Sequence, residues 1–116
     1  MYRTAMVSKD LVAASSRPLV LAILSEGESY GYAIIQRVRE LSGDRLQWTD
    51  GMLYPVLHRL ERQGLIVSEW RKPDSGRRRK YYHIVPEGKA ALKEEKRQWQ
   101  IVQDTLENVW RKPCHV

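Results

Sequence analysis

Residues 49–84 read TDGMLYPVLHRLERQGLIVSEWRKPDSGRRRKYYHI, and this stretch decides the fold. Four apolar residues in its first third recur at the spacing of one helix face: Leu53, Val56, Leu57 and Leu60. Thr49 precedes them as a candidate N-cap, and Gly64 follows where a left-handed residue commonly ends a helix. The pattern predicts a helix from about Asp50 to Gln63 that packs this face against a core.

The opposite face of this predicted helix is polar and open to close approach. It combines hydrogen-bonding, aromatic and cationic side chains with a glycine that has no Cβ to block contact. The residues of this face are Gly51, Tyr54, His58, Arg59 and Arg62. An ordinary amphipathic helix with a solvated polar face fits the same spacing, so the helix alone leaves both interpretations open.

A β-hairpin is predicted to follow the helix. Segments 65–70 and 78–85 are rich in β-branched and aromatic residues, and the intervening segment 71–77 holds the Pro, Asp, Ser and Gly of a turn. In the second strand, period-two alternation places Tyr82 and Ile84 on the core face.

The charge of the chain is concentrated on this helix and hairpin. The net charge is +6, and between Arg59 and Lys80 eight basic residues face three acidic ones. The rest of the chain has 12 basic and 11 acidic residues. A solvated surface would spread its charge, so this basic patch and the pI near 9.7 favour a polyanionic partner, with nucleic acid first.

Composition excludes several classes of protein. A chain of 116 residues is long enough for one domain with a modest core. No apolar run approaches the roughly 18 residues of a membrane span, and no signal-peptide core is present, so we expect a cytoplasmic protein with no membrane partner. Cys114 is the single cysteine, which excludes an intramolecular disulfide. Without HExxH, CxxC, a glycine-rich phosphate loop or a serine elbow, we predict no catalytic residues, metal or cofactor, and no enzyme.

The N-terminal segment is predicted to be helical. Apolar residues over 10–25 suggest one helix, but Pro18 interrupts the pattern. Because Ser15 and Ser16 precede it as possible caps, we expect a kinked helix or two short ones.

A supporting helix is expected over 30–41, with Ser29 as its N-cap. The short segment 46–48 is a candidate third strand at the edge of the hairpin.

The last helix is predicted from about Pro86 to Trp110. Val85 supplies no side-chain cap, whereas Pro86 suits the first helical position and Glu87 the positive end of the helix dipole. At about 1.5 Å per residue it is near 37 Å long, too long for so small a domain to cover. Apolar residues recur along it at heptad spacings, except where Glu95 intervenes: Leu92, Trp99, Val102, Leu106 and Val109. Such a seam needs a partner helix, so we infer a homodimer through these residues.

Two motifs resemble the PadR family of bacterial transcriptional regulators. They are GMLYPVLHRLERQGLIVSEW at 51–70 and GRRRKYYHIVPEGKAAL at 76–92, and the resemblance extends back through SEGESYGYAIIQRVRE to cover roughly residues 10–110. Members of this family are winged-helix proteins. The resemblance therefore implies that residues 50–63 form a recognition helix, that residues 65–85 form the wing, and that the protein is a homodimer.

The predicted fold is mostly α with a small β-hairpin, of the α+β class. Residues 1–85 would form an N-terminal arm and a winged helix-turn-helix DNA-binding domain. Residues 86–116 would form a C-terminal dimerisation helix and tail.

Double-stranded DNA is the predicted partner. The polar face of the recognition helix, with Thr49 at its start, would enter the major groove, and the helix N-terminus would lie near a phosphate. The wing would bring four cations to phosphates or to the adjacent minor groove: Lys72, Arg77, Arg78 and Lys80. Two copies would read an inverted repeat, and we expect a repressor. The alternative is a winged helix that binds an acidic protein partner through the wing.

A small aromatic effector is a further expectation. In some members of the PadR family, an aromatic residue on the last helix lines a dimer-interface cavity that takes flat aromatic compounds. Trp99 is the matching candidate here, with Gln103 one turn on. The alternative is that Trp99 only supplies packing area in the seam.

Overall fold

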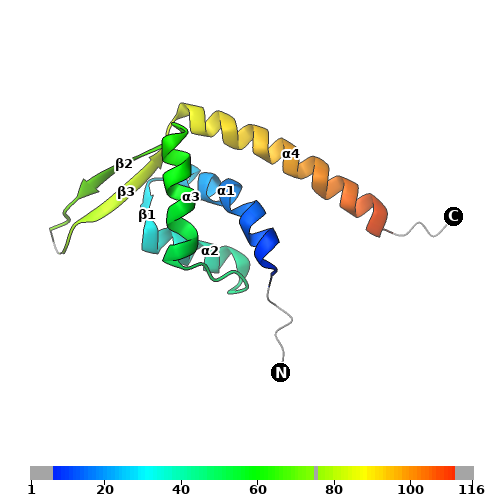
Figure 1. Ribbon diagram of the computed structural model, residues 1–116, viewed down its shortest axis with the longest axis horizontal. Helices are drawn as coiled ribbons and strands as arrows, with labels where there is room; N and C mark the ends of the chain where they lie inside the picture. The colour runs from blue at the N-terminus through cyan, green and yellow to red at the C-terminus, as the bar shows by residue number, and fades with distance from the viewer. Residues whose placement is uncertain (1–6, 75, 112–116) are drawn as a thin grey trace, which may run out of the picture.

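The computed structural model describes residues 7–74 and 76–111. Within these ranges the chain forms α1 (Lys9–Ser25), β1 (Ser29–Tyr30), α2 (Gly31–Ser42), α3 (Asp50–Arg62), β2 (Ile66–Arg71), β3 (Arg79–Ile84) and α4 (Pro86–Trp110). Figure 1 shows α1, α2 and α3 at the centre, the β2–β3 hairpin protruding on one side and α4 extending on the other. This helical fold with a small antiparallel sheet confirms the predicted α+β class.

The α3 helix occupies the predicted residues. Thr49 is its N-cap, and the Thr49 Oγ1 accepts a hydrogen bond from the Met52 backbone N–H at 3.3 Å. Gly64 adopts a φ of 76° just beyond the helix, the left-handed conformation expected there. Pro55 lies inside the helix without ending it. The predicted core face is buried throughout: Leu53, Val56, Leu57 and Leu60.

The sheet has the strand order β1-β3-β2, with all strands antiparallel. The predicted hairpin is confirmed, and Tyr82 and Ile84 of β3 are buried as the alternation predicts. The predicted third strand at residues 46–48 is wrong, because Ser29 and Tyr30 pair with β3 instead. Trp48 explains the difference: its side chain is buried in the core, so the segment follows the core surface and does not extend along the sheet.

The α1 helix is continuous through Pro18, so of the two predicted alternatives the pair of short helices is wrong. Its N-cap is Ser8, which accepts a hydrogen bond from the Leu11 backbone N–H at 3.2 Å. Ser15 and Ser16 are not caps, because their hydroxyls donate to carbonyls of the preceding turn. The helix packs against α2, α3, α4 and β3. This tertiary packing outweighs the one hydrogen bond that proline removes.

The α2 helix begins one residue later than predicted, at Gly31, and lies directly against α3. Ser29 belongs to β1, and the N-cap is Tyr30, which makes no side-chain cap hydrogen bond. Gly31 is buried, and a Cβ at this position would collide with the Tyr54 hydroxyl of α3. Glycine at 31 therefore allows Tyr54 to lie against the start of α2.

The α4 helix has the predicted bounds, and it leaves the core after its second turn. Pro86 occupies its first turn and Val85 provides no side-chain cap, as expected. Leu92 is buried in the common core, and Glu95 forms an ion pair with Arg17 of α1. From residue 96 to residue 110 every residue is exposed, which matches the extended helix in Figure 1. Among the described residues, no helix is both long and apolar enough to cross a membrane.

Candidate nucleic-acid interface

A cleft separates the wing from one edge of the exposed face of α3. The α3 helix contributes Tyr54, which is half-buried, and His58, which is exposed; their ring centroids lie 6.3 Å apart. The start of α2 contributes Tyr30 and Tyr32 to the same cleft. The wing contributes the opposite wall: Trp70, Arg77, Arg78, Arg79, Lys80 and Tyr82.

The cations of this cleft stack on aromatic rings. The Arg78 guanidinium lies 4.9 Å from the centroid of the Trp70 ring, and the Arg79 guanidinium lies 4.5 Å from that of Tyr30. The Lys80 ammonium lies 5.9 Å from the Trp70 ring and 5.7 Å from the Tyr82 ring. Such contacts are attractive and restrict long side chains, so positive charge is held in place at the cleft.

The rest of the α3 face turns away from the wing. Gly51 and Arg59 line a groove formed with the first half of α1 and with Trp48, while Arg62 is exposed at the end of the helix. Lys72 and Arg77 are exposed in the loop that joins the strands. The structure therefore divides the predicted α3 residues between two grooves: Tyr54 and His58 face the wing, whereas Gly51 and Arg59 lie beside α1.

Six residues that line this cleft were not predicted as site residues: Tyr30, Gly31, Tyr32, Trp70, Arg79 and Tyr82. Tyr32 and Trp70 present large rings at the surface of the cleft, with 66% and 56% of each residue exposed, respectively. The sequence SYGY at 29–32 was a usable signal, because two tyrosines flank a glycine at a helix start.

Tyr82 is the buried member of the cleft wall. Its side chain is fully buried, and its hydroxyl has no hydrogen-bond partner among the described residues. Burial, with smaller contributions from Tyr54 and Glu61, raises the pKa of Tyr82 to about 12.

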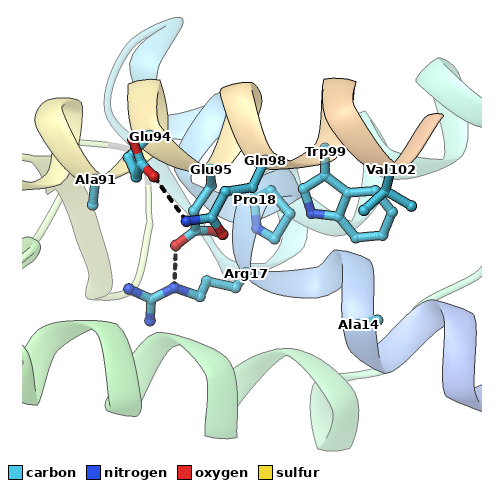
Figure 2. A pocket seen from close by; sticks show the side chains of 9 residues that line it. All are labelled: Ala14, Arg17, Pro18, Ala91, Glu94, Glu95, Gln98, Trp99 and Val102. Carbon is cyan, nitrogen blue, oxygen red and sulfur yellow. Dashed lines mark hydrogen bonds and ion pairs between the residues drawn. The ribbon is translucent and has the colours of Figure 1, made fainter. Parts of the chain in front are cut away.

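A second groove lies between α1 and α4 and contains the predicted effector residue Trp99. Figure 2 shows the Trp99 ring on α4 facing the α1 helix near Ala14, with the Arg17–Glu95 ion pair farther along. Gln103 does not line this groove; its amide donates to Glu107 at 3.5 Å. The residue that does line it is Gln98, which donates to Glu94 at 2.8 Å.

Comparison with known proteins identifies the family and the fold of the chain. Residues 20–94 match the Transcriptional regulator PadR-like family. The chain belongs to the PadR-like family. It is 40% identical over 89 residues to the transcriptional regulator Rv3488 of Mycobacterium tuberculosis, covering 77% of this chain and 79% of that protein.

Solved structures agree with this assignment. A transcriptional regulator from Clostridium thermocellum superposes with a TM-score of 0.80 at 29% identity, covering 88% of this chain and 96% of that one. A PadR family transcriptional regulator from Eggerthella lenta gives a TM-score of 0.77 at 33% identity, covering 90% and 88%. The PadR-like proteins are transcriptional regulators and not enzymes, so this protein is a DNA-binding regulator of transcription, as its sequence predicted.

Proposed function

We propose that this PadR-like protein is a homodimeric repressor that binds an inverted repeat in duplex DNA and is released by a planar aromatic compound. The observation that carries the proposal is the surface shared by α3 and the wing, where cations are held on aromatic rings beside the exposed face of a helix. Positive charge ordered in this way suits a phosphate backbone, and a helix edge beside it suits a groove.

In the proposed complex, α3 lies in the major groove. Thr49 and the helix N-terminus approach a phosphate, and the base edges are read by side chains of the exposed face: Tyr54, His58, Arg59 and Arg62. Gly51 lets the helix come close to the DNA. The wing neutralises phosphates with Lys72, Arg77, Arg78 and Lys80.

The proposed dimer forms through the part of α4 that leaves the core. Trp99, Val102, Leu106 and Val109 lie on one side of this segment and are between 38% and 72% exposed. We do not include Leu92 in the proposed seam, because this residue is only 6% exposed and packs in the core of its own chain. Glu95, at the missing heptad position, pairs with α1 of its own chain. The seam therefore starts at Trp99.

The proposed effector site is the groove between α1 and α4 beside Trp99 (Figure 2). Gln98 replaces Gln103 as its polar residue, since only Gln98 lines the groove. An effector bound there changes repression only if it binds DNA-competent and DNA-incompetent dimers with different affinities.

Titration of planar aromatic dyes should quench tryptophan fluorescence in the wild type and not in Trp99→Ala. Persistent quenching in that variant would leave Trp99 as a packing residue.

Selection of bound duplexes from a random DNA pool tests the proposed function. We expect an inverted repeat with half-sites one helical turn apart, about 34 Å between centres, because two α3 helices related by a dyad must both reach the major groove. Recovery of single, unrepeated sites would contradict the dimeric mode. Recovery of no enriched sequence would favour the protein-binding alternative.

A further inference from the structure

The outer end of the wing is tied to the turn between α1 and α2 by Arg71. This residue is the last of β2, and its Nη1 and Nη2 donate to Oε2 and Oε1 of Glu28 at 2.6 and 2.7 Å. Its Nε donates to Glu69 at 2.9 Å. The Glu28 contact is bidentate and joins segments 43 residues apart in the chain. Parallel bidentate bonds fix the orientation of both groups as well as their distance.

The same guanidinium continues into the aromatic residues of the sheet. Arg71 lies 4.6 Å from the ring centroid of Tyr81, which contacts Tyr30 edge-on at 5.4 Å. Tyr30 and Tyr81 are also register partners of β1 and β3. The contacts from Glu28 through Arg71 and Tyr81 to Tyr30 therefore link the outer part of the hairpin to β1 and to the turn that precedes it.

Arg71 differs from the other wing cations, because three of its five donors are already used by carboxylates. The hydrogen bond from Arg71 lowers the pKa of the Glu28 carboxyl and raises the pKa of Arg71 itself. Arg78 and Arg79, by comparison, stack on rings, and among the described residues neither donates a side-chain hydrogen bond. Arg71 is thus committed to the protein and not to phosphate.

The inner half of the hairpin packs on the helices: Ile66, Tyr82 and Ile84 join the core, and Ser68 donates to Glu61 of α3 at 2.6 Å. The pairing with β1 does not reach the outer end of the hairpin. The β1 strand is two residues long and pairs with Tyr81 and Tyr82 alone. Beyond that pairing, the hairpin continues to Arg71 and Arg79 at its outer end, and Figure 1 shows it protruding from the helices. A small rotation at the base would therefore move the loop cations by a larger distance.

We propose that Glu28 and Arg71 form a positioning pair that holds the wing at the angle needed to reach DNA together with α3. The inference rests on the proposed function of the α3 and wing surface. An isolated surface ion pair adds little to stability, so the pair acts through orientation and the protein folds without it. The bidentate geometry and the ring contact supply the directionality that a single charge pair lacks.

The variant Glu28→Gln separates this inference from simple electrostatics. It removes one negative charge, so a purely electrostatic account predicts tighter DNA binding. The positioning account predicts binding weaker by roughly tenfold, within the range of coupling measured for residues in contact. The salt dependence should keep its slope, because every cation that neutralises a phosphate is still present.

Glu26→Gln is the matched control. Glu26 lies two residues away and makes an equivalent bidentate pair with Arg37 at 2.9 Å, but it does not contact the wing. This variant has the same charge as Glu28→Gln and should bind DNA at least as tightly as the wild type. If the two variants bind DNA equally, the positioning pair is refuted.

A double-mutant cycle and a charge swap complete the test. Arg71→Gln should weaken binding as Glu28→Gln does, and the double variant should be no weaker than either single variant, because both remove one interaction. The swapped protein Glu28→Arg/Arg71→Glu should recover part of the affinity. Additive losses, or a swap as weak as the double variant, would contradict the proposal.

Hydrogen exchange of the wing amides decides the question without DNA. Removal of the pair should accelerate exchange in the outer parts of β2 and β3 several-fold in Glu28→Gln and not in Glu26→Gln, because the outer end of the hairpin is freed. Equal exchange in both variants would overturn the inference. If the wild type bound no duplex at all, the proposed function would fail, and this exchange experiment would still test the pair.

Discussion

Gly51 is a helical residue for which the described chain shows no packing reason. A Cβ there would contact only the Thr49 Oγ1, at an ordinary 3.8 Å. Glycine destabilises a helix by about 0.5–1 kcal/mol relative to alanine. Gly51→Ala should therefore raise the free energy of unfolding by up to that amount, measured by urea denaturation. It should also weaken DNA binding about tenfold, equal to about 1.4 kcal/mol, if the DNA backbone approaches this residue.

Gly88→Ala provides the contrast for this prediction. A Cβ at Gly88 would collide with the Leu65 carbonyl and with Ile84, so this variant should be destabilised where Gly51→Ala is stabilised. Unchanged DNA affinity in Gly51→Ala would remove close approach as the reason for glycine at this position.

Tyr82 makes the stability of the protein sensitive to alkaline pH. Its pKa is raised to about 12 in the folded state, so the folded protein keeps this proton between pH 10 and 12 while the unfolded chain loses it. The free energy of unfolding should fall as pH rises through this window and should be unaffected by Tyr82 below pH 10. Tyr82→Phe should reduce the fall, measured by denaturation at a series of pH values. It should also stabilise the protein by about 1 kcal/mol at pH 7, since it removes a buried hydroxyl without a partner.

At the scale of elements, the sequence predicted α3, the hairpin and α4 with their bounds almost unchanged. Each has a strong local signal: helical spacing with caps for α3, strand alternation for β3, and Pro86 at the start of α4. Two predictions were wrong because tertiary packing determines these segments: the division of residues 10–25 into two short helices, and the third strand at residues 46–48. The helix at Pro18 is held by four neighbouring elements, and Trp48 is drawn into the core.

The sequence predicted the cations of the candidate interface but not the aromatic residues beside them, because tertiary structure brings those rings to the cleft. The wing cations could be found by counting charged residues along the chain, because the identity of each residue gives its charge directly. The aromatic rings beneath them come from segments up to about 50 residues apart, such as Tyr30 and Arg79, and only the sheet register brings these together. The assignment of Leu92 to the seam likewise needed the structure, because heptad spacing does not show where a helix leaves its own core.

The exposed part of α4 should be the association surface. Leu106→Glu with Val109→Glu places two charges on the apolar strip and should convert the dimer to a monomer, measured by light scattering at micromolar concentration. Gln100→Glu with Asn108→Glu adds the same negative charge on the opposite side of the helix and should leave the dimer intact. An unchanged mass for the first variant would exclude this strip as the seam.

At the scale of the whole molecule, the cationic hairpin and the exposed part of α4 lie on opposite sides of the central helices (Figure 1). The molecule extends 64 × 40 × 20 Å, with the cationic hairpin on one side of the helices and the apolar α4 on the other (Figure 1). Residues 59–80 carry a surplus of five positive charges, out of a net charge of +6 for the chain. Dimerisation through α4 would present two copies of the cationic surface to one duplex, which is what reading an inverted repeat requires.

The salt dependence of duplex binding in a wing variant is the most direct measurement of this account. Arg77→Ala with Arg78→Ala should weaken binding to all sequences alike and reduce the salt slope by about one for each phosphate that the wing no longer neutralises. The control variant Arg39→Ala with Arg97→Ala removes the same charge outside the proposed DNA-binding surface. Arg39 pairs with Asp44 and Arg97 with Glu94, so the salt slope should be unchanged. If the wing variant bound DNA with the affinity and slope of the wild type, the proposed DNA-binding surface would be contradicted.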